Sequence, residues 1–192
     1  MFREQLRPAI FIFIILTAIT GILYPLFVTV IAQTFFHTEA NGSLVYQDGK
    51  IVGSVLIGQS FDGPKYLWGR LSTTSPVPYN ASSSSGSNIG PSNGALLEIV
   101  KSRIEKLRAV DPKNKAPIPV DLATSSASGL DPHISLAGAY YQIPRITRER
   151  GLSVNIVKNI IDRNAKGRLF GLIGEPVVSV LKVNMDLDLY KK

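Results

Sequence analysis

The most prominent pattern in the sequence is one uninterrupted apolar segment, AIFIFIILTAITGILYPLFVTVIA, which runs from Ala9 to Ala32. It carries no charged side chain, and as a helix it would be about 36 Å long, enough to cross a hydrocarbon core of ~30 Å. Backbone groups in lipid must be hydrogen-bonded within their own segment. The pattern therefore predicts a transmembrane helix over residues 9–32.

The charges that flank this segment predict its orientation. Arg3 and Arg7 precede it, whereas no lysine or arginine follows until Lys50. Positive charge is enriched on the cytoplasmic side of membrane spans. We therefore expect residues 1–8 to be cytoplasmic and residues 33–192 to form an extracytoplasmic domain.

A cleavable signal peptide is the alternative interpretation, since Val30 and Ala32 suit a signal peptidase site. The apolar stretch, however, is far longer than the ~7–15 residues of a signal-peptide core, which favours a retained anchor. Within the anchor, Thr17, Gly21 and Pro25 recur at intervals of four. Small residues at this spacing allow another helix to approach closely, so we predict membrane-helix packing on this face.

The hydrophobic pattern after the anchor first predicts strands and then a long loop. Residues 44–47 and 50–57 flank Asp48-Gly49, a strong signal for a two-residue hairpin turn. Residues 70–94 have almost no periodicity and are rich in serine, so we expect a mobile or functional loop there, part of it docked through Pro76, Pro78 and Tyr79.

Two amphipathic helices follow, one over residues 95–110 with Asn93 as its N-cap and Asp111-Pro112 as its stop, and one from Ser153 to about Gly167. Between them, the proline-bearing segment KNKAPIPVDLAT, residues 113–124, is expected to lead into a short strand. Residues 181–189 alternate apolar and polar positions and predict a C-terminal strand with one wet face. The predicted fold class is α+β: a single N-terminal transmembrane helix followed by one mixed soluble domain.

Composition narrows the possible functions. The chain of 192 residues has no cysteine, which excludes disulfides and thiolate chemistry, and its net charge is +7. The basic residues are scattered and have few aromatic neighbours, which favours a solvated surface and no nucleic-acid partner. With His37 and His133 as the only two histidines, the chain predicts no multi-histidine metal site.

The stretch SASGLDPHIS, residues 126–135, places Ser128, Asp131 and His133 close together in sequence. A hydrolytic triad is one interpretation, but the stretch lacks the G-x-S-x-G pattern of a nucleophile elbow. The chain also lacks a phosphate-binding loop and an H-E-x-x-H motif. Physical reasoning favours a turn at which Asp131 caps a helix that starts at Pro132, with Ser135 as a second possible cap and Pro144 breaking or restarting the helix.

The same stretch, followed by Gln142-Ile143-Pro144-Arg145, resembles the signature of the KdpC family, the C subunits of bacterial Kdp potassium-transporting ATPases. Further segments fit in order: the Tyr24-Pro25 pair in the anchor, NGSL, GSVLIGQSF, WGR, PYN, SGSN and IGEPVVSVL. The resemblance covers essentially the whole chain, and the order and spacing of the segments make it specific.

This resemblance implies a non-catalytic accessory subunit of a potassium import complex. Its expected partners are a channel-like potassium-translocating subunit, a P-type ATPase subunit, a very small membrane peptide and membrane lipid. The family is also described as a catalytic chaperone that raises the ATP affinity of the ATPase subunit, with nucleotide contacted by a glutamine that matches Gln142. ATP is cytoplasmic, so this description conflicts with the predicted topology, and we give the charge asymmetry precedence. The soluble domain is then expected to cap the external mouth of the channel-like subunit.

The sequence therefore gives a set of candidates for the subunit interface or the implied nucleotide contact: Arg70, Asn88, Ser128, Asp131, His133, Gln142 and Arg145. Capping is the alternative role for Ser128 and Asp131, ordinary surface charge for Arg70 and Arg145, and a satisfied polar residue at a helix end for Gln142. No catalytic residue, metal ligand or covalently bound cofactor is predicted. A membrane-anchored extracytoplasmic hydrolase and a secreted binding module are the two alternative functions.

Overall fold

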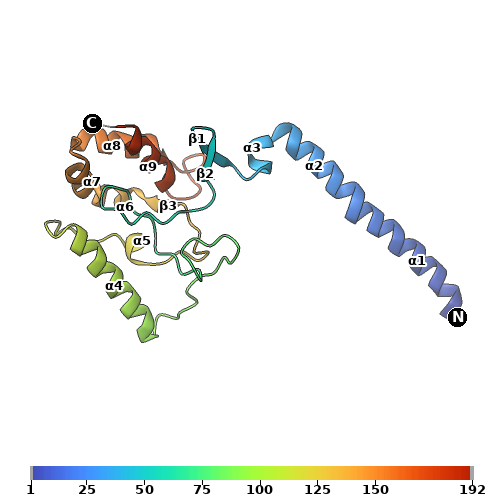
Figure 1. Cartoon of the computed structure of the whole chain (residues 1–192). Coiled ribbons are helices and arrows are strands. Elements are labelled where there is room, and N and C mark those ends of the chain that lie inside the picture. Colours follow the sequence, from blue (N-terminus) through green and yellow to red (C-terminus); the bar gives the residue numbers. More distant parts are fainter. Residues whose placement is uncertain (1, 191–192) are drawn as a thin grey trace. The chain divides into compact units, whose positions relative to one another are not determined.

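The computed structural model describes residues 2–190, which fall into two compact units with the boundary between Leu44 and Val45. The first unit is helical, and its elements are α1 (Phe2–Ala18), the π-helical turn η1 (Ile19–Leu23), α2 (Tyr24–Phe35) and α3 (His37–Ala40). From Glu4 to Phe35 these elements form one continuous helix, long and apolar enough to cross a membrane (Figure 1). The predicted apolar N-terminal helix is therefore present.

The π turn in this helix has a local cause. Pro25 has no backbone N–H, and a proline ring clashes with the carbonyl four residues earlier, here that of Gly21. The helical turn just before the proline contains one extra residue, because the backbone N–H of Tyr24 bonds to the carbonyl of Ile19, five residues earlier. Pro25 then falls in the first turn of α2, where the missing donor is tolerated.

The second unit is a mixed α+β domain, which confirms the predicted fold class. Its elements are β1 (Leu44–Gln47), β2 (Lys50–Ser54), α4 (Gly94–Val110), α5 (Val120–Ala123), β3 (His133–Ser135), α6 (Leu136–Tyr141), α7 (Ile143–Arg150), α8 (Val154–Arg163), β4 (Ala165–Lys166), β5 (Val177–Ser179) and α9 (Val180–Leu189). The strands form a β1–β2 hairpin and a three-stranded antiparallel sheet in the order β3–β5–β4.

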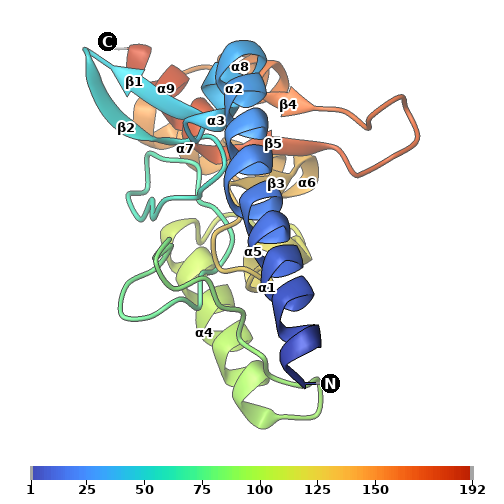
Figure 2. The same cartoon turned by 90° about the vertical axis from the view of Figure 1, so that its right-hand side faces the viewer.

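The core of this domain lies where α7, α8 and α9 pack around the three-stranded sheet. Buried apolar residues of the core come from residues 67–68 and from the chain after residue 106: Leu67, Trp68, Leu107, Leu122, Ile134, Ile146, Val157, Ile160, Val178, Val183 and Leu187. Residues 55–93 contain no helix or extended strand and reach the core through Leu67 and Trp68. Figure 2 shows this long segment, together with α4, on one side of the domain.

Several local predictions are confirmed. Asp48 and Gly49 both have positive φ, 50° and 74°, as the hairpin turn requires. Asn93 caps α4 by accepting a hydrogen bond from the N–H of Ala95, and Ser153 caps α8 in the same manner from Ile156. The helix restarts at Pro144, which lies in the first turn of α7.

The predicted C-terminal strand is wrong, because residues 180–189 form the helix α9. Val180, Val183, Asn184 and Leu187 are buried, and this spacing is that of one helix face. The error has a physical origin: Asn184 was assigned to the wet face because it is polar, whereas its amide is 1% exposed and bonds both backbone groups of Leu67.

Four smaller predictions also fail. The connection over residues 113–124 does not lead directly into a strand, because its end forms the helical turn α5 and the next strand, β3, begins at His133. β2 ends at Ser54 instead of residue 57. The helix from Ser153 ends at Arg163, because Asn164 satisfies the carbonyl of Ile160 with its side chain, so Gly167 lies beyond it. Asp131 does not cap a helix: its carboxylate accepts from the N–H of His133 at 2.9 Å, at the start of β3, and the cap of α6 is Ser135.

Truncation of two leucines in α9 separates the helix from the strand experimentally. Leu187 is fully buried and Leu189 is 74% exposed, although a strand would place both on one face. We expect Leu187→Ala to lower the free energy of unfolding by about 2–5 kcal/mol, and Leu189→Ala to change it by less than about 0.5 kcal/mol. Denaturant titration of the full chain in detergent, followed by the fluorescence of the single tryptophan, Trp68, measures both; equal losses would contradict the helix.

Candidate partner-binding site

Three of the sequence-predicted residues meet at the surface of the soluble domain. Arg70 follows the core tryptophan, whereas Asp131 and His133 lie at the start of β3, 61 and 63 positions further along the chain. Arg70 Nη1 donates to Asp131 Oδ2 at 3.2 Å, and the same guanidinium donates through Nη2 to the carbonyl of Ser125 at 3.0 Å. His133 Nδ1 lies 3.7 Å from Asp131 Oδ1. The three side chains are about one-quarter exposed, so the cluster is accessible but held in place.

The electrostatics of this cluster do not resemble a catalytic site. Burial lowers the pKa of His133, an effect reinforced by Lys166 and Lys182 and opposed by Asp131, so the imidazole is neutral at pH 7. Ser128 is exposed, and its hydroxyl accepts a hydrogen bond from the N–H of Leu130. No Ser–His hydrogen bond occurs among residues 2–190, so the residues of SASGLDPHIS are not arranged as a triad.

A shallow groove of about 640 Å³ lies beside the cluster. Arg70 and Asn88 both line it, together with residues 86–90 and 125–127. Asn88 has a positive φ of 51°, a conformation that asparagine tolerates better than most residues. The groove therefore brings Asn88 to the same surface as Arg70.

The loop that carries Asn88 is fixed to the domain by its own polar groups. The backbone N–H of Ser85 bonds to the carbonyl of Ser128 at 3.0 Å, and Tyr79 Oη donates to the carbonyl of Arg70 at 2.6 Å. Burial raises the pKa of Tyr79 to about 12, which keeps its hydroxyl a donor at physiological pH. An added Cβ at Gly129 would come within 2.7 Å of the carbonyl of Ser85, so the loop can dock only against glycine there.

Gln142 and Arg145 form a separate, buried junction inside the domain. Gln142 is 1% exposed, and its amide uses every polar atom: Oε1 accepts from the N–H of Trp68, while Nε2 donates to the carbonyls of Trp68 and Gly138. Arg145 Nη2 donates to the same Oε1 at 2.6 Å. The glutamine therefore acts as a strap between the Trp68 segment and the α6–α7 corner.

The guanidinium of Arg145 completes this junction. It is 2% exposed and donates through Nη1 to the carbonyls of Pro64 and Tyr66, and its charge lies 4.8 Å from the Trp68 ring centre. Burial lowers the pKa of Arg145 to about 10, so it remains charged at pH 7. Carbonyl dipoles and the tryptophan face thus replace the water that the charge has lost.

Two residues of the junction escaped the sequence analysis, Trp68 and Asn184. Trp68 carried a signal as the single tryptophan of the chain, whereas Asn184 carried none, because it falls on the polar side of the alternating pattern over residues 181–189. The remaining predicted residues, Thr17, Gly21 and Pro25, lie in the helical first unit. Within residues 2–190 no three His, Cys, Asp or Glu side chains gather in a way that would hold a metal ion.

Comparison with known proteins gives consistent matches along the chain. The family model described as "KdpC: K+-transporting ATPase, c chain" matches residues 6–189. A potassium-transporting ATPase KdpC subunit of Dechloromonas aromatica is 57% identical over 190 residues, 99% of this chain and 100% of the relative. The KdpC subunit of Sorangium cellulosum is 56% identical over 184 residues, 96% and 97% of the two chains. That of Herpetosiphon aurantiacus is 54% identical over 189 residues, 98% of each.

Replacement of Gln142 tests whether the junction is structural. Gln142→Ala leaves the N–H and carbonyl of Trp68 unpaired in the interior, so we expect a loss of about 3–5 kcal/mol in the free energy of unfolding. Ser128→Ala, in the same sequence signature but exposed, is the control and should change it by less than about 0.5 kcal/mol. Unfolding of the full chain in detergent, followed by Trp68 fluorescence, gives both values. An unchanged stability of Gln142→Ala would refute the strap.

Proposed function

The chain belongs to the KdpC family of potassium-transporting ATPase subunits, and on that premise we propose that it holds the channel-like and ATPase subunits of an ATP-driven potassium importer together. It is an accessory subunit and not the catalytic one. The match over residues 6–189 is the observation that carries the proposal, because it spans both the anchor and the soluble domain. The candidate surfaces are then contacts for partner subunits, and the very small membrane peptide is a further expected partner.

Within the membrane, we assign partner contact to the face formed by Thr17, Gly21 and Pro25. In a regular α-helix, residues four apart are offset by about 40° around the axis. The turn from Ile19 to Leu23 takes more residues, so it reduces this offset and brings the three residues closer to one line. A Cβ built on Gly21 meets only Thr17 Cγ2, at 4.0 Å, so the chain's own packing does not require the glycine. Close approach of a partner helix would explain a glycine at position 21.

Outside the membrane, the proposed partner surface is the Arg70–Asp131–His133 cluster with the adjoining groove at Asn88 and the exposed Ser128. These side chains are accessible, whereas Gln142 and Arg145 are not. The positive charge before the anchor supports an extracytoplasmic domain. In that orientation, the domain would cap the external mouth of the channel-like subunit.

The chaperone role implied by the resemblance is compatible with this proposal only if the domain acts indirectly. The domain would act on the ATPase subunit through the subunit that it caps, without binding ATP itself. Gln142 supports indirect action, since every polar atom of its side chain is used inside the domain. The buried Arg145, likewise, is committed to backbone carbonyls.

Co-purification tests the assembly role and the membrane face together. Extraction of native membranes in mild detergent should recover this chain with a P-type ATPase and a large polytopic subunit; recovery of the chain alone would refute the proposed function. Gly21→Leu should reduce recovery of the partners by roughly 5- to 30-fold, the equivalent of about 1–2 kcal/mol of helix packing. Val30→Phe adds bulk at an exposed position nine residues away, about half a turn around the helix from Gly21, and is the control.

Protease accessibility tests the topology. Trypsin added outside intact spheroplasts should cleave the soluble domain, which exposes lysines such as Lys65, Lys101 and Lys106, and should leave a protected fragment that contains the anchor. A domain that is cut only after the spheroplasts are lysed would place it in the cytoplasm and reverse the orientation. A mature chain that begins near Gln33 would identify the apolar segment as a cleaved signal.

A further inference from the structure

The connection between β4 and β5 is an ordered hairpin end that carries four large apolar side chains to its tip. Leu169, Phe170, Leu172 and Ile173 are between 59% and 85% exposed. Phe170 and Gly171 have positive φ, and Leu169 exchanges backbone hydrogen bonds with Ile173 at 2.8 and 3.0 Å. We call residues 167–176 the apolar finger; Figure 2 shows it extending beyond the rest of the domain. A preformed apolar end of this kind marks an interaction site.

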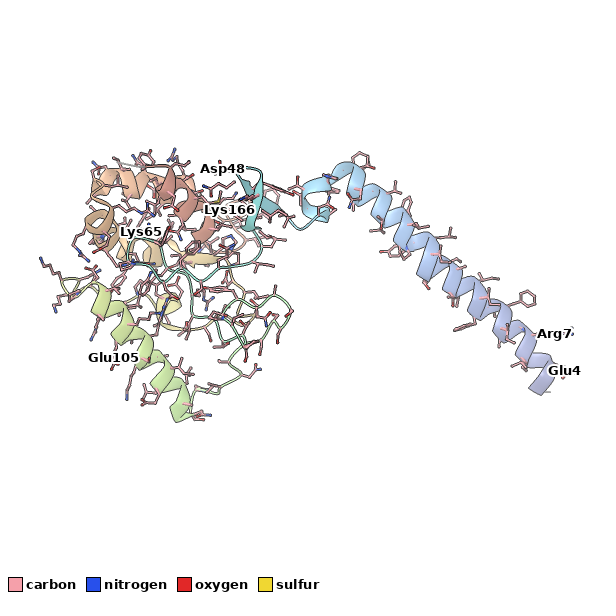
Figure 3. All side chains as sticks on the ribbon, viewed as in Figure 1. Glu4, Arg7, Asp48, Lys65, Glu105 and Lys166 are labelled. Carbon is pink, nitrogen blue, oxygen red and sulfur yellow. The ribbon has the colours of Figure 1, made fainter. Side chains whose placement is uncertain are left out.

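At the base of the finger lies a small cavity of about 90 Å³ that is rich in positive charge. Arg163, Lys166 and Lys182 line it, and none of the three forms an ion pair within the described part of the chain. Lys166 is the last residue of β4 and belongs to the soluble unit (Figure 3). The nearby carboxylates are engaged elsewhere: Asp131 by Arg70, and Asp186 by the side-chain amide of Asn164. We call this cavity the cationic pocket.

A second, independent feature of the same pocket is the hydroxyl of Ser179. Ser179 precedes α9 at the N-cap position, yet it makes no capping hydrogen bond. It lines the cationic pocket, is only 5% exposed, and its Oγ has no hydrogen-bond partner. The first turn of a ten-residue helix adds a partial positive charge at the same place. Hydroxyl, helix end and three cations together form a set of donors suited to a phosphate group.

The spacing of the finger and the pocket fits the cross-section of a membrane surface. Lys166 precedes Phe170 by four residues, about 13 Å along an extended chain. Interfacial apolar groups insert ~5–10 Å past the boundary between headgroups and acyl chains. A tip inserted to that depth leaves the cationic pocket at the level of the lipid phosphates.

The anchor keeps such a surface within reach. α2 ends at Phe35 and β1 begins at Leu44, so eight residues join the membrane helix to the domain. Even fully extended, eight residues span no more than about 29 Å. The domain therefore stays close to the bilayer, whichever side it occupies.

We propose that the apolar finger and the cationic pocket together bind an anionic phospholipid, with the tip among the acyl chains and the headgroup phosphate in the pocket. Charge complementarity favours lipid over an apolar cleft of a protein, because the cations at the base match a layer of phosphates next to hydrocarbon. The inference does not depend on the potassium-transport proposal, since it requires only an anchored chain.

Site-specific fluorescence of the full-length chain tests this proposal, because the absence of native cysteines allows a single label. Leu172→Cys carries the environment-sensitive dye NBD at the tip, and Leu97→Cys on α4, also an exposed leucine, is the control. The chain alone is placed in nanodiscs of phosphatidylcholine, with or without about 30% phosphatidylglycerol. In the anionic discs we expect quenching by spin-labelled acyl chains to be at least about twofold stronger at the tip than at the control site.

Charge removal then tests the pocket separately from the finger. Lys166→Gln and Lys182→Gln are surface changes that leave the core untouched. Each should lower the ratio of chains with the tip in the membrane to chains with the tip in water roughly fivefold. Lys113→Gln and Lys115→Gln remove the same charge from an exposed loop and should have no such effect.

Three outcomes would overturn the proposal. The first is a tip label that remains in water in every disc. The second is equal quenching in neutral and anionic discs, which would show that the pocket does not select an anionic headgroup. The third is a label shielded only when the other subunits are reconstituted with the chain, which would identify the occupant of the finger as protein.

Discussion

A polar group removed from water must find a partner, and this constraint shapes both units of the molecule. In the anchor, the hydroxyls of Thr20 and Thr34 bond back to carbonyls four residues earlier, each at 2.7 Å. Just before Pro25 the helix itself widens, so that the N–H of Tyr24 reaches Ile19. In the soluble domain the same constraint acts on Arg145, whose charge is surrounded by carbonyls, an amide and the Trp68 ring.

This constraint separates the residues that build the domain from those that are available to a partner. Gln142 and Asn184 each hold both backbone groups of a residue in the 67–68 segment, which has no helix or strand of its own to satisfy it. Their side-chain amides are therefore occupied by hydrogen bonds inside the domain. Arg70, by contrast, keeps about a quarter of its side chain exposed although it bonds to Asp131 and Ser125. Asn88 and the apolar side chains of the finger are exposed as well. In a subunit without catalytic function, such groups are what remains for binding.

The sequence predicted the parts of the fold that depend on local rules. The apolar span, the Asp48-Gly49 turn, and the caps at Asn93 and Ser153 each follow from a few neighbouring residues. The predictions from sequence failed where a residue's role depends on a partner that is distant in sequence. Asn184 is polar but buried, because its amide bonds both backbone groups of Leu67, which lies 117 positions away in sequence. A polar residue on the buried helix face made the pattern look like that of a strand. Asp131 met the rules for a cap, yet Arg70 and the start of β3 hold its carboxylate instead.

Several weak attachments suit an assembly subunit better than a single strong one. A lone helix packed on a Gly21 face contributes only about 1–2 kcal/mol, which by itself is a poor tether for a complex. Once the anchor is in the bilayer, however, the soluble domain is confined to a layer set by its eight-residue connection, and each further contact becomes intramolecular. A lipid contact at the finger and a protein contact at the Arg70 cluster would then restrict the domain's rotation as well as its distance. In the proposed assembly role, several modest contact surfaces would therefore be enough to hold larger partners in place.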